Sequence, residues 1–111
     1  MEDIIRICKH VIECIVNCDY GLLEEEGALS RVSENDIRRV LNEYNPNENI
    51  ITPPDDYYKK IYINKYKDGS GYYVDIDLWY CSGRSDLTLQ IDIRKKECNE
   101  WSFKIDDLRV L

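Results

Sequence analysis

The second half of the chain alternates apolar and polar residues, and this period of two constrains the fold more than any other feature. In residues 72–79, one set of alternate side chains is apolar or aromatic: Tyr72, Val74, Ile76 and Leu78. The set between them is Tyr73, Asp75, Asp77 and Trp79. Successive side chains of a strand point to opposite faces, so the segment predicts a strand with one dry and one wet face. Such strands are typical of an antiparallel sheet that is covered on one side.

Three further segments alternate in the same way and predict a four-stranded sheet. The expected strands are residues 61–66, 72–79, 87–94 and a fourth from residue 100 onwards. Asp68-Gly69-Ser70-Gly71 has the composition of a turn between the first two strands, and residues 81–85 are expected to connect the next pair. Short connections between consecutive strands favour a meander. We therefore expect strands that follow one another in space as they do in sequence.

The first half has a period of 3.6 instead. Residues 2–18 place their apolar side chains on one broad arc at 100° per residue, which predicts a mostly buried helix. Residues 22–26 allow one or two further helical turns. Ser33, with Asp36 three residues later, resembles a capping box and predicts the start of a second clear helix.

This order of elements predicts one α+β domain over residues 1–111. The helices are expected at about 2–44, a proline-bearing loop at about 45–57 and the antiparallel sheet at about 58–111. Helices grouped before strands favour α+β over alternating βαβ units. A chain of 111 residues has room for one core, so we expect the N-terminal helices to cover the apolar face of the sheet.

The charge balance limits the classes of partner. The chain has 22 acidic and 15 basic residues, and its formal net charge is −7. Nucleic-acid binding needs a basic surface that neutralises phosphates, and adsorption to anionic lipid needs the same sign of charge. We therefore expect neither nucleic acid nor membrane as a partner. An acidic domain suits a basic protein, because complementary charge speeds encounter.

The cysteines and the N-terminus predict a cytoplasmic protein. No apolar segment is long enough to span a bilayer, and the chain begins with acidic rather than basic residues, unlike a signal peptide. The five cysteines are odd in number and include no Cys-x-x-Cys pair. A disulfide framework is therefore not expected, which agrees with the reducing cytosol.

Neither a catalytic residue nor a metal site nor a cofactor is expected. His10, Cys14 and Cys18 are spaced by four along the first helix and could bind zinc together with Cys81 or Cys98. The cysteines also fit as small apolar residues at the edge of the buried arc, and we favour that interpretation. A His10–Cys14 contact is possible on a helix, but no third group that would orient the histidine is evident.

Acidic and aromatic residues form the predicted partner-binding surface. Asp75 and Asp77 share a strand face, with Asp92 expected on the neighbouring strand of that wet face. This face is either simply solvated or docks basic side chains, and Tyr62, Tyr73, Trp79 and Tyr80 are expected to line it or its rim. The residues predicted to bind a partner are Asp55, Asp56, Tyr57, Tyr58, Asp75, Asp77 and Trp79.

Two short motifs carry a family resemblance. They are Gly83-Arg84-Ser85-Asp86-Leu87-Thr88 and, at the C-terminus, Asp106-Asp107-Leu108-Arg109-Val110-Leu111. The chain resembles an uncharacterised family of small bacterial domains with Gly-Arg-Ser-Asp-Leu-Thr and Asp-Asp-Leu-x-Val-Leu signatures. In physical terms, Arg84 is expected to pair with Asp86 or with the acidic pair at residues 106–107, while Leu108 and Val110 seal the core.

The size, acidity and layout are also similar to those of immunity proteins from contact-dependent growth inhibition and other polymorphic toxin systems. That resemblance implies a bacterial, cytoplasmic, non-enzymatic protein that binds and neutralises a cognate toxin C-terminal domain. The toxin is expected to be a basic nuclease whose active or substrate-binding site is occluded, and the free chain a monomer or weak homodimer.

Two alternatives remain open. The layout is similar to the cystatin/NTF2-like cone, which we expect as the fold, and the first alternative function is therefore an NTF2-like small-molecule-binding or enzymatic domain with a pocket between helix and sheet. The inward positions that would line this pocket are all apolar, which favours a filled core: Val74, Ile76, Leu78, Leu87, Leu89, Ile91, Phe103 and Ile105. The other alternative is an interaction domain that dimerises through its open sheet face.

Overall fold

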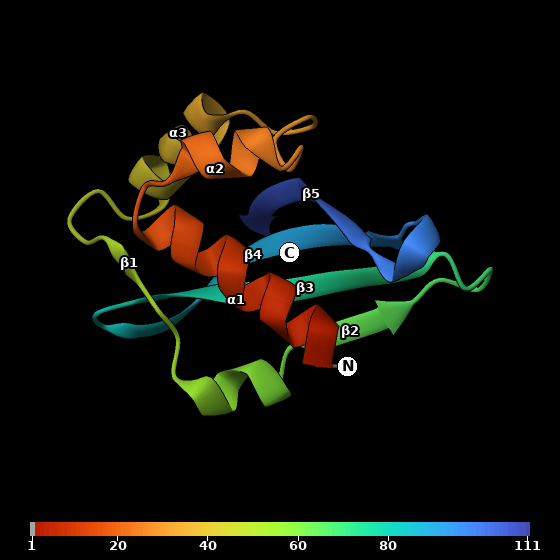
Figure 1. Cartoon of the computed structure of the whole chain (residues 1–111). Helices are drawn as coiled ribbons and strands as arrows, with labels where there is room; N and C mark the ends of the chain where they lie inside the picture. The colour runs from red at the N-terminus through yellow and green to blue at the C-terminus, as the bar shows by residue number, and fades with distance from the viewer. Residues whose placement is uncertain (1) are drawn as a thin grey trace.

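Three helices precede a five-stranded antiparallel sheet in the computed structural model, which describes residues 2–111 (Figure 1). The helices are α1 (Glu2–Val16), α2 (Tyr20–Glu25) and α3 (Glu34–Tyr44). The strands are β1 (Ile50–Ile51), β2 (Tyr62–Lys65), β3 (Gly71–Tyr80), β4 (Gly83–Lys95) and β5 (Trp101–Val110). Two short 3-10 helices, η1 (Asp55–Lys59) and η2 (Glu97–Asn99), lie between strands. The predicted α+β class is confirmed.

The sheet has one more strand than the alternation predicts. β3, β4 and β5 pair in sequence order, and β1 and β2 both pair with the other edge of β3. β1 pairs with the end of β3, where Ile50 is opposite Tyr80, and β2 pairs with its beginning. The segment expected to be a loop therefore contains a strand and the start of η1. Two residues are too few to show an alternation, so β1 has no signal in the sequence.

The core lies between α1 and one face of the sheet. α1 crosses in front of β3 and β4 in Figure 1, and its buried residues join those of the sheet in one apolar cluster. Of the residues predicted to point inward, Phe103 is partly buried and the other seven are buried. Each large apolar side chain buried in this way stabilises the fold by about 1.5–3 kcal/mol.

The capping box is also confirmed. The Ser33 hydroxyl accepts a hydrogen bond from the Asp36 N–H at 3.1 Å, and the Asp36 carboxylate accepts one from the Ser33 N–H at 3.2 Å. These bonds satisfy two amides that have no partner within the helix. The segment before this cap is fixed to β5, because the Ile105 N–H donates to the Ala28 carbonyl at 2.9 Å.

A bulge in the middle of β5 changes which residues reach the core. Ile105 is opposite Ile91 and Leu108 is opposite Leu89, so β5 has one more residue than β4 between these two pairs. Both residues are buried although they are three positions apart. Val110, expected to help seal the core, is 51% exposed because it is the last residue of the strand. The prediction that Val110 seals the core is therefore wrong, whereas the same prediction for Leu108 is confirmed.

Three other expectations are wrong in the β3–β4 hairpin. β4 begins at Gly83, so only residues 81–82 form the turn, and Arg84 is already in a strand. From there its guanidinium pairs with Asp77, at 2.8 Å from the carboxylate, and not with Asp86 or the acidic pair near the C-terminus. Tyr80 is 2% exposed and faces the core, because it continues the inward series of β3.

Candidate functional site

The two tyrosines of the predicted binding surface are buried, whereas the two acids beside them are exposed. Tyr57 and Tyr58 lie in η1 and are 4% and 2% exposed. Asp55 and Asp56 occupy the first turn of η1 at the surface, and the Asp55 carboxylate lies 3.6 Å from the Lys9 ammonium of α1. Lys9 also lies over the Tyr58 ring, 5.1 Å from its centroid. The structure therefore places η1 against one flank of α1.

Tyr57 fills the gap between β1 and β2 along the edge of β3. Its hydroxyl accepts a hydrogen bond from the Asp77 N–H at 2.8 Å, at a position where neither short strand pairs with β3. The ring packs edge-on against Trp79 with centroids 5.5 Å apart, and the Arg84 guanidinium lies 4.9 Å from the ring centroid. Burial raises the pKa of Tyr57. Tyr57 therefore stabilises the fold through its contacts with Asp77 and Trp79.

The predicted acidic pair on β3 is engaged by neighbouring side chains. Arg84 and the Thr88 hydroxyl both donate to Asp77, the hydroxyl at 2.8 Å. The Gln90 amide donates to Asp75 at 3.1 Å. Asp75 and Asp77 share the outer sheet face as predicted, but the charge of Asp77 is balanced by Arg84. This face therefore presents less free negative charge than the sequence suggests.

Asp92 lies on the same face and is 4% exposed, contrary to the expected wet surface. Its carboxylate accepts hydrogen bonds from Arg31 at 2.9 Å, Arg94 at 2.9 Å and the Tyr66 hydroxyl at 2.7 Å. Burial alone would raise the pKa of Asp92, but the hydrogen bonds from these three residues outweigh it and hold the pKa below the ordinary value of 3.8. Asp92 therefore joins the segment between α2 and α3 to the sheet.

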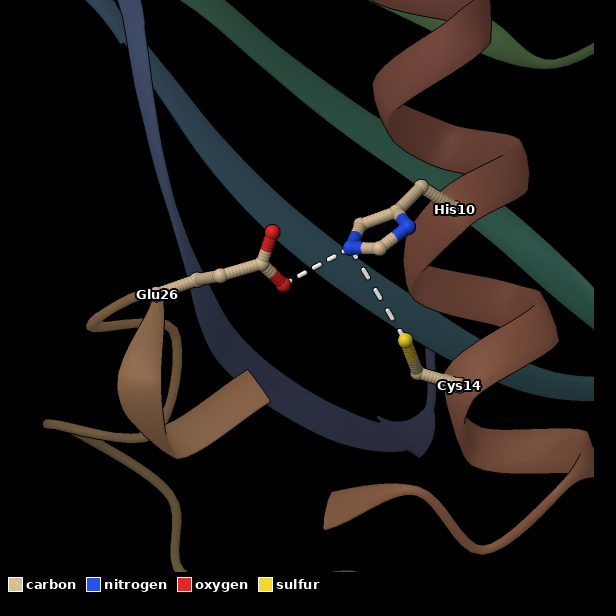
Figure 2. Close-up of side chains that lie close together, drawn as sticks. All are labelled: His10, Cys14 and Glu26. Carbon is tan, nitrogen blue, oxygen red and sulfur yellow. Dashed lines mark hydrogen bonds and ion pairs between the residues drawn. The ribbon is translucent and has the colours of Figure 1, made fainter. Parts of the chain in front are cut away.

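A second cluster lies where α2 approaches α1, on the opposite flank of α1 from η1 (Figure 1), and its side chains are drawn in Figure 2. The His10 ring nitrogen Nε2 is 2.7 Å from the Glu26 carboxylate and 3.8 Å from the Cys14 sulfur. His10 and Cys14 lie one turn apart on α1, and Glu26 directly follows α2. The His10–Cys14 contact was foreseeable from the spacing of four. The Glu26 contact was not, because periodicity does not place α2 relative to α1.

This cluster does not have the geometry of a cysteine nucleophile. A catalytic histidine contacts the nucleophile with one ring nitrogen and an orienting carboxylate with the other. Here, both Cys14 and Glu26 approach the same nitrogen of His10. Burial, and then the negative charges of Glu26, Asp19 and Glu13, raise the pKa of the Cys14 thiol. A raised pKa disfavours the thiolate that attack requires. Cys18 is exposed beyond the end of α1 and is not part of the cluster.

Free negative charge is concentrated beside this cluster. We define the acidic ridge as Glu13, Asp19, Glu24 and Glu25, which are all exposed on α1 and around α2. Among the residues that the structure describes, none of these four has an ion-pair partner. The acids around α2 and those of η1 therefore lie on the two flanks of α1 (Figure 1), and Glu13 lies on α1 itself, where its charge acts on both Cys14 and Tyr58. No helix within residues 2–111 is both long enough and apolar enough to cross a bilayer.

The comparisons with known proteins give a family and no activity. No curated protein and no solved structure matches the chain. A family model described as "Domain of unknown function (DUF7668)" matches residues 12–111, which is nearly the whole length. The chain therefore belongs to the DUF7668 family.

Proposed function

We propose that this protein is an acidic protein-binding domain that neutralises a basic partner. The observation that carries the proposal is the exposed negative charge on both flanks of α1, from the acidic ridge and from the η1 acids. Among the described residues, the ridge and Asp56 have no ion-pair partner, whereas Asp55 is paired with Lys9 at 3.6 Å. Surface charges that no internal partner balances attract an oppositely charged protein and increase its rate of association.

More specifically, we propose an immunity protein that binds a cognate toxin C-terminal domain, for which a basic nuclease is the best candidate. The resemblance to immunity proteins of polymorphic toxin systems, together with the charge of −7, supports this choice. A nuclease presents basic side chains to nucleic-acid phosphates, and an acidic inhibitor is suited to occupy that surface. The protein would act in the cytoplasm as a monomer or weak homodimer until the toxin binds.

The packing of the core supports a binding function over a ligand pocket. The inward side chains of the central strands, such as Val74, Ile76 and Ile91, are fully buried against the apolar cluster. A cystatin- or NTF2-like arrangement of the sheet around α1 is part of this proposal, and α1 lying across the sheet supports it (Figure 1). In this arrangement, the space where such folds hold a ligand would be filled by side chains.

Charge reversal tests the proposal and locates the surface. The variants Asp55→Lys/Asp56→Lys and Glu24→Lys/Glu25→Lys each change exposed acids, of which only Asp55 has an ion-pair partner, Lys9, while its own side chain is 92% exposed. We expect each to slow association with the toxin domain encoded beside the gene by about tenfold or more, as electrostatic steering is lost. We also expect each to reduce protection of cells that make this toxin. Asp75 and Asp77 are less suitable, because reversal at Asp77 would also break its contact with Arg84.

The matched control is Glu97→Lys/Glu100→Lys, which makes the same change in net charge at exposed positions before β5. It should leave protection nearly unchanged. If the control variant loses as much protection as both test variants, net charge alone matters and the position of the acids does not. If both test variants protect cells fully, the two flanks of α1 are not the binding surface.

A further inference from the structure

We propose that His10, Cys14 and Glu26 form a binding site for a divalent transition-metal ion of the zinc type. The donor atoms are the His10 Nε2, the Cys14 sulfur and a Glu26 carboxylate oxygen, and they lie within 4.8 Å of one another. Figure 2 shows the three side chains converging from α1 and from the end of α2. This inference does not depend on the proposed immunity function.

The distances are close to those of a tetrahedral zinc site. Zinc–ligand bonds of ordinary length place neighbouring donor atoms about 3.4–3.6 Å apart. The observed sulfur–nitrogen distance is 3.8 Å and the nitrogen–oxygen distance is 2.7 Å. To make room for a metal ion, the Glu26 carboxylate would need to move away from the His10 nitrogen by less than about 1 Å, which is roughly half a metal–ligand bond length. Glu26 has a long side chain that ends at the surface, so this adjustment needs no change in α1.

The donor set favours zinc and similar ions over calcium or magnesium. A thiolate and an imidazole are ligands for zinc, cobalt or nickel, whereas calcium and magnesium prefer oxygen. Cys14 is buried, and the side chains of His10 and Glu26 are each about one-third exposed, so the thiol lies at the base of a site that is open to solvent. Three protein ligands leave one coordination position for water or for a ligand from another molecule.

The surrounding charge also favours a cation. Glu13 and Asp19 are close enough for their charge to act on the Cys14 thiol, and among the described residues neither has an ion-pair partner. In this setting, a divalent ion would offset negative charges that otherwise repel one another. The simpler interpretation is an ion pair between His10 and Glu26 that joins α1 to α2, and metal titration distinguishes the two.

The test is a titration of the untagged, fully reduced chain with cobalt(II), followed by displacement with zinc. We expect one equivalent of cobalt to bind, with a thiolate-to-cobalt charge-transfer band and the strong visible absorption of a tetrahedral ion. Binding replaces the thiol proton with the metal, so the affinity should increase with pH.

Two variants and two matched controls assign the ligands. We expect Cys14→Ser to abolish the charge-transfer band and Glu26→Gln to weaken binding by about tenfold or more. The control Cys18→Ser removes a thiol that lies one helical turn after Cys14, and the control Glu25→Gln removes a carboxylate one residue before Glu26. Both variants should bind cobalt like the unmodified chain. Circular dichroism confirms folding, and Glu26→Gln decides the question if Cys14→Ser does not fold. Absence of the band, or equal binding by Glu26→Gln and Glu25→Gln, would leave only the ion pair.

Discussion

Asp92 shows how partners that are distant in sequence can turn a residue of an expected wet face into a buried anion. Alternation correctly places it on the face opposite the core. Alternation does not predict the burial of Asp92, because this burial results from Arg31 and Tyr66, which are 61 and 26 residues away in the chain. The same limit applies to Tyr57 and Tyr58. Tyrosine next to aspartate is typical of a binding surface. However, the edge of β3 that faces β1 and β2 has no neighbouring strand at Asp77, and the Tyr57 hydroxyl accepts the hydrogen bond of the Asp77 N–H there.

We predict that Asp92→Asn lowers the free energy of unfolding by about 1.5–3 kcal/mol, because Arg31 and Arg94 lose a charged acceptor. Both arginines are nearly half exposed, so the lower end of that range is expected. Urea denaturation measures the loss. Asp106→Asn is the control, since Asp106 shares Arg31 but is itself 38% exposed. Asp106→Asn should lower the free energy of unfolding by less than about 0.5 kcal/mol.

The same residue sets part of the acid dependence of stability. The folded protein holds the pKa of Asp92 below 3.8, so its contribution is present above that pH and is lost as the pH falls further. The stability difference between the unmodified chain and Asp92→Asn should therefore shrink below about pH 4. A difference that stays constant down to about pH 2 would contradict this assignment.

At the scale of elements, periodicity identifies the long segments well and the short or irregular ones poorly. The long helix, the capping box at Ser33 and the alternation of the central strands all correspond to observed elements. β1 is missed because it has two residues, and the β5 bulge is missed because it shifts the alternation by one residue. The contact of Glu26 with His10 depends on the turn between α1 and α2, which no periodic pattern describes.

Gly71 provides a prediction for the sheet. A Cβ atom at this position would lie 2.0 Å from the Ile93 carbonyl oxygen, within the β3–β4 pairing. Gly71→Ala should therefore destabilise the fold by about 3 kcal/mol or more, because backbone atoms must move apart. Gly21→Ala is the matched control, since a Cβ atom at this position of α2 would meet nothing within 4 Å beyond its own helix. It should be neutral or stabilise by up to about 1 kcal/mol. Similar urea midpoints for the two variants would refute the close approach.

For the whole molecule, composition predicts the sign of the charge but not where it lies. A net charge of −7 suggests a basic partner, and the structure shows which acids are free to meet one. The predicted surface combines η1 with β3, whereas the free charge flanks α1 and includes acids of α2 that the sequence treats as a simple charge run. The position of α1 between two acidic segments is therefore the feature on which the proposed function depends.

The most direct test of the proposed function is the native mass of the purified protein mixed with the toxin domain that the proposal expects to be encoded beside its gene. We predict a one-to-one complex that forms more slowly as the salt concentration rises and that abolishes the toxin's activity. If the protein remains free in the mixture and the toxin keeps its full activity, the immunity function is contradicted.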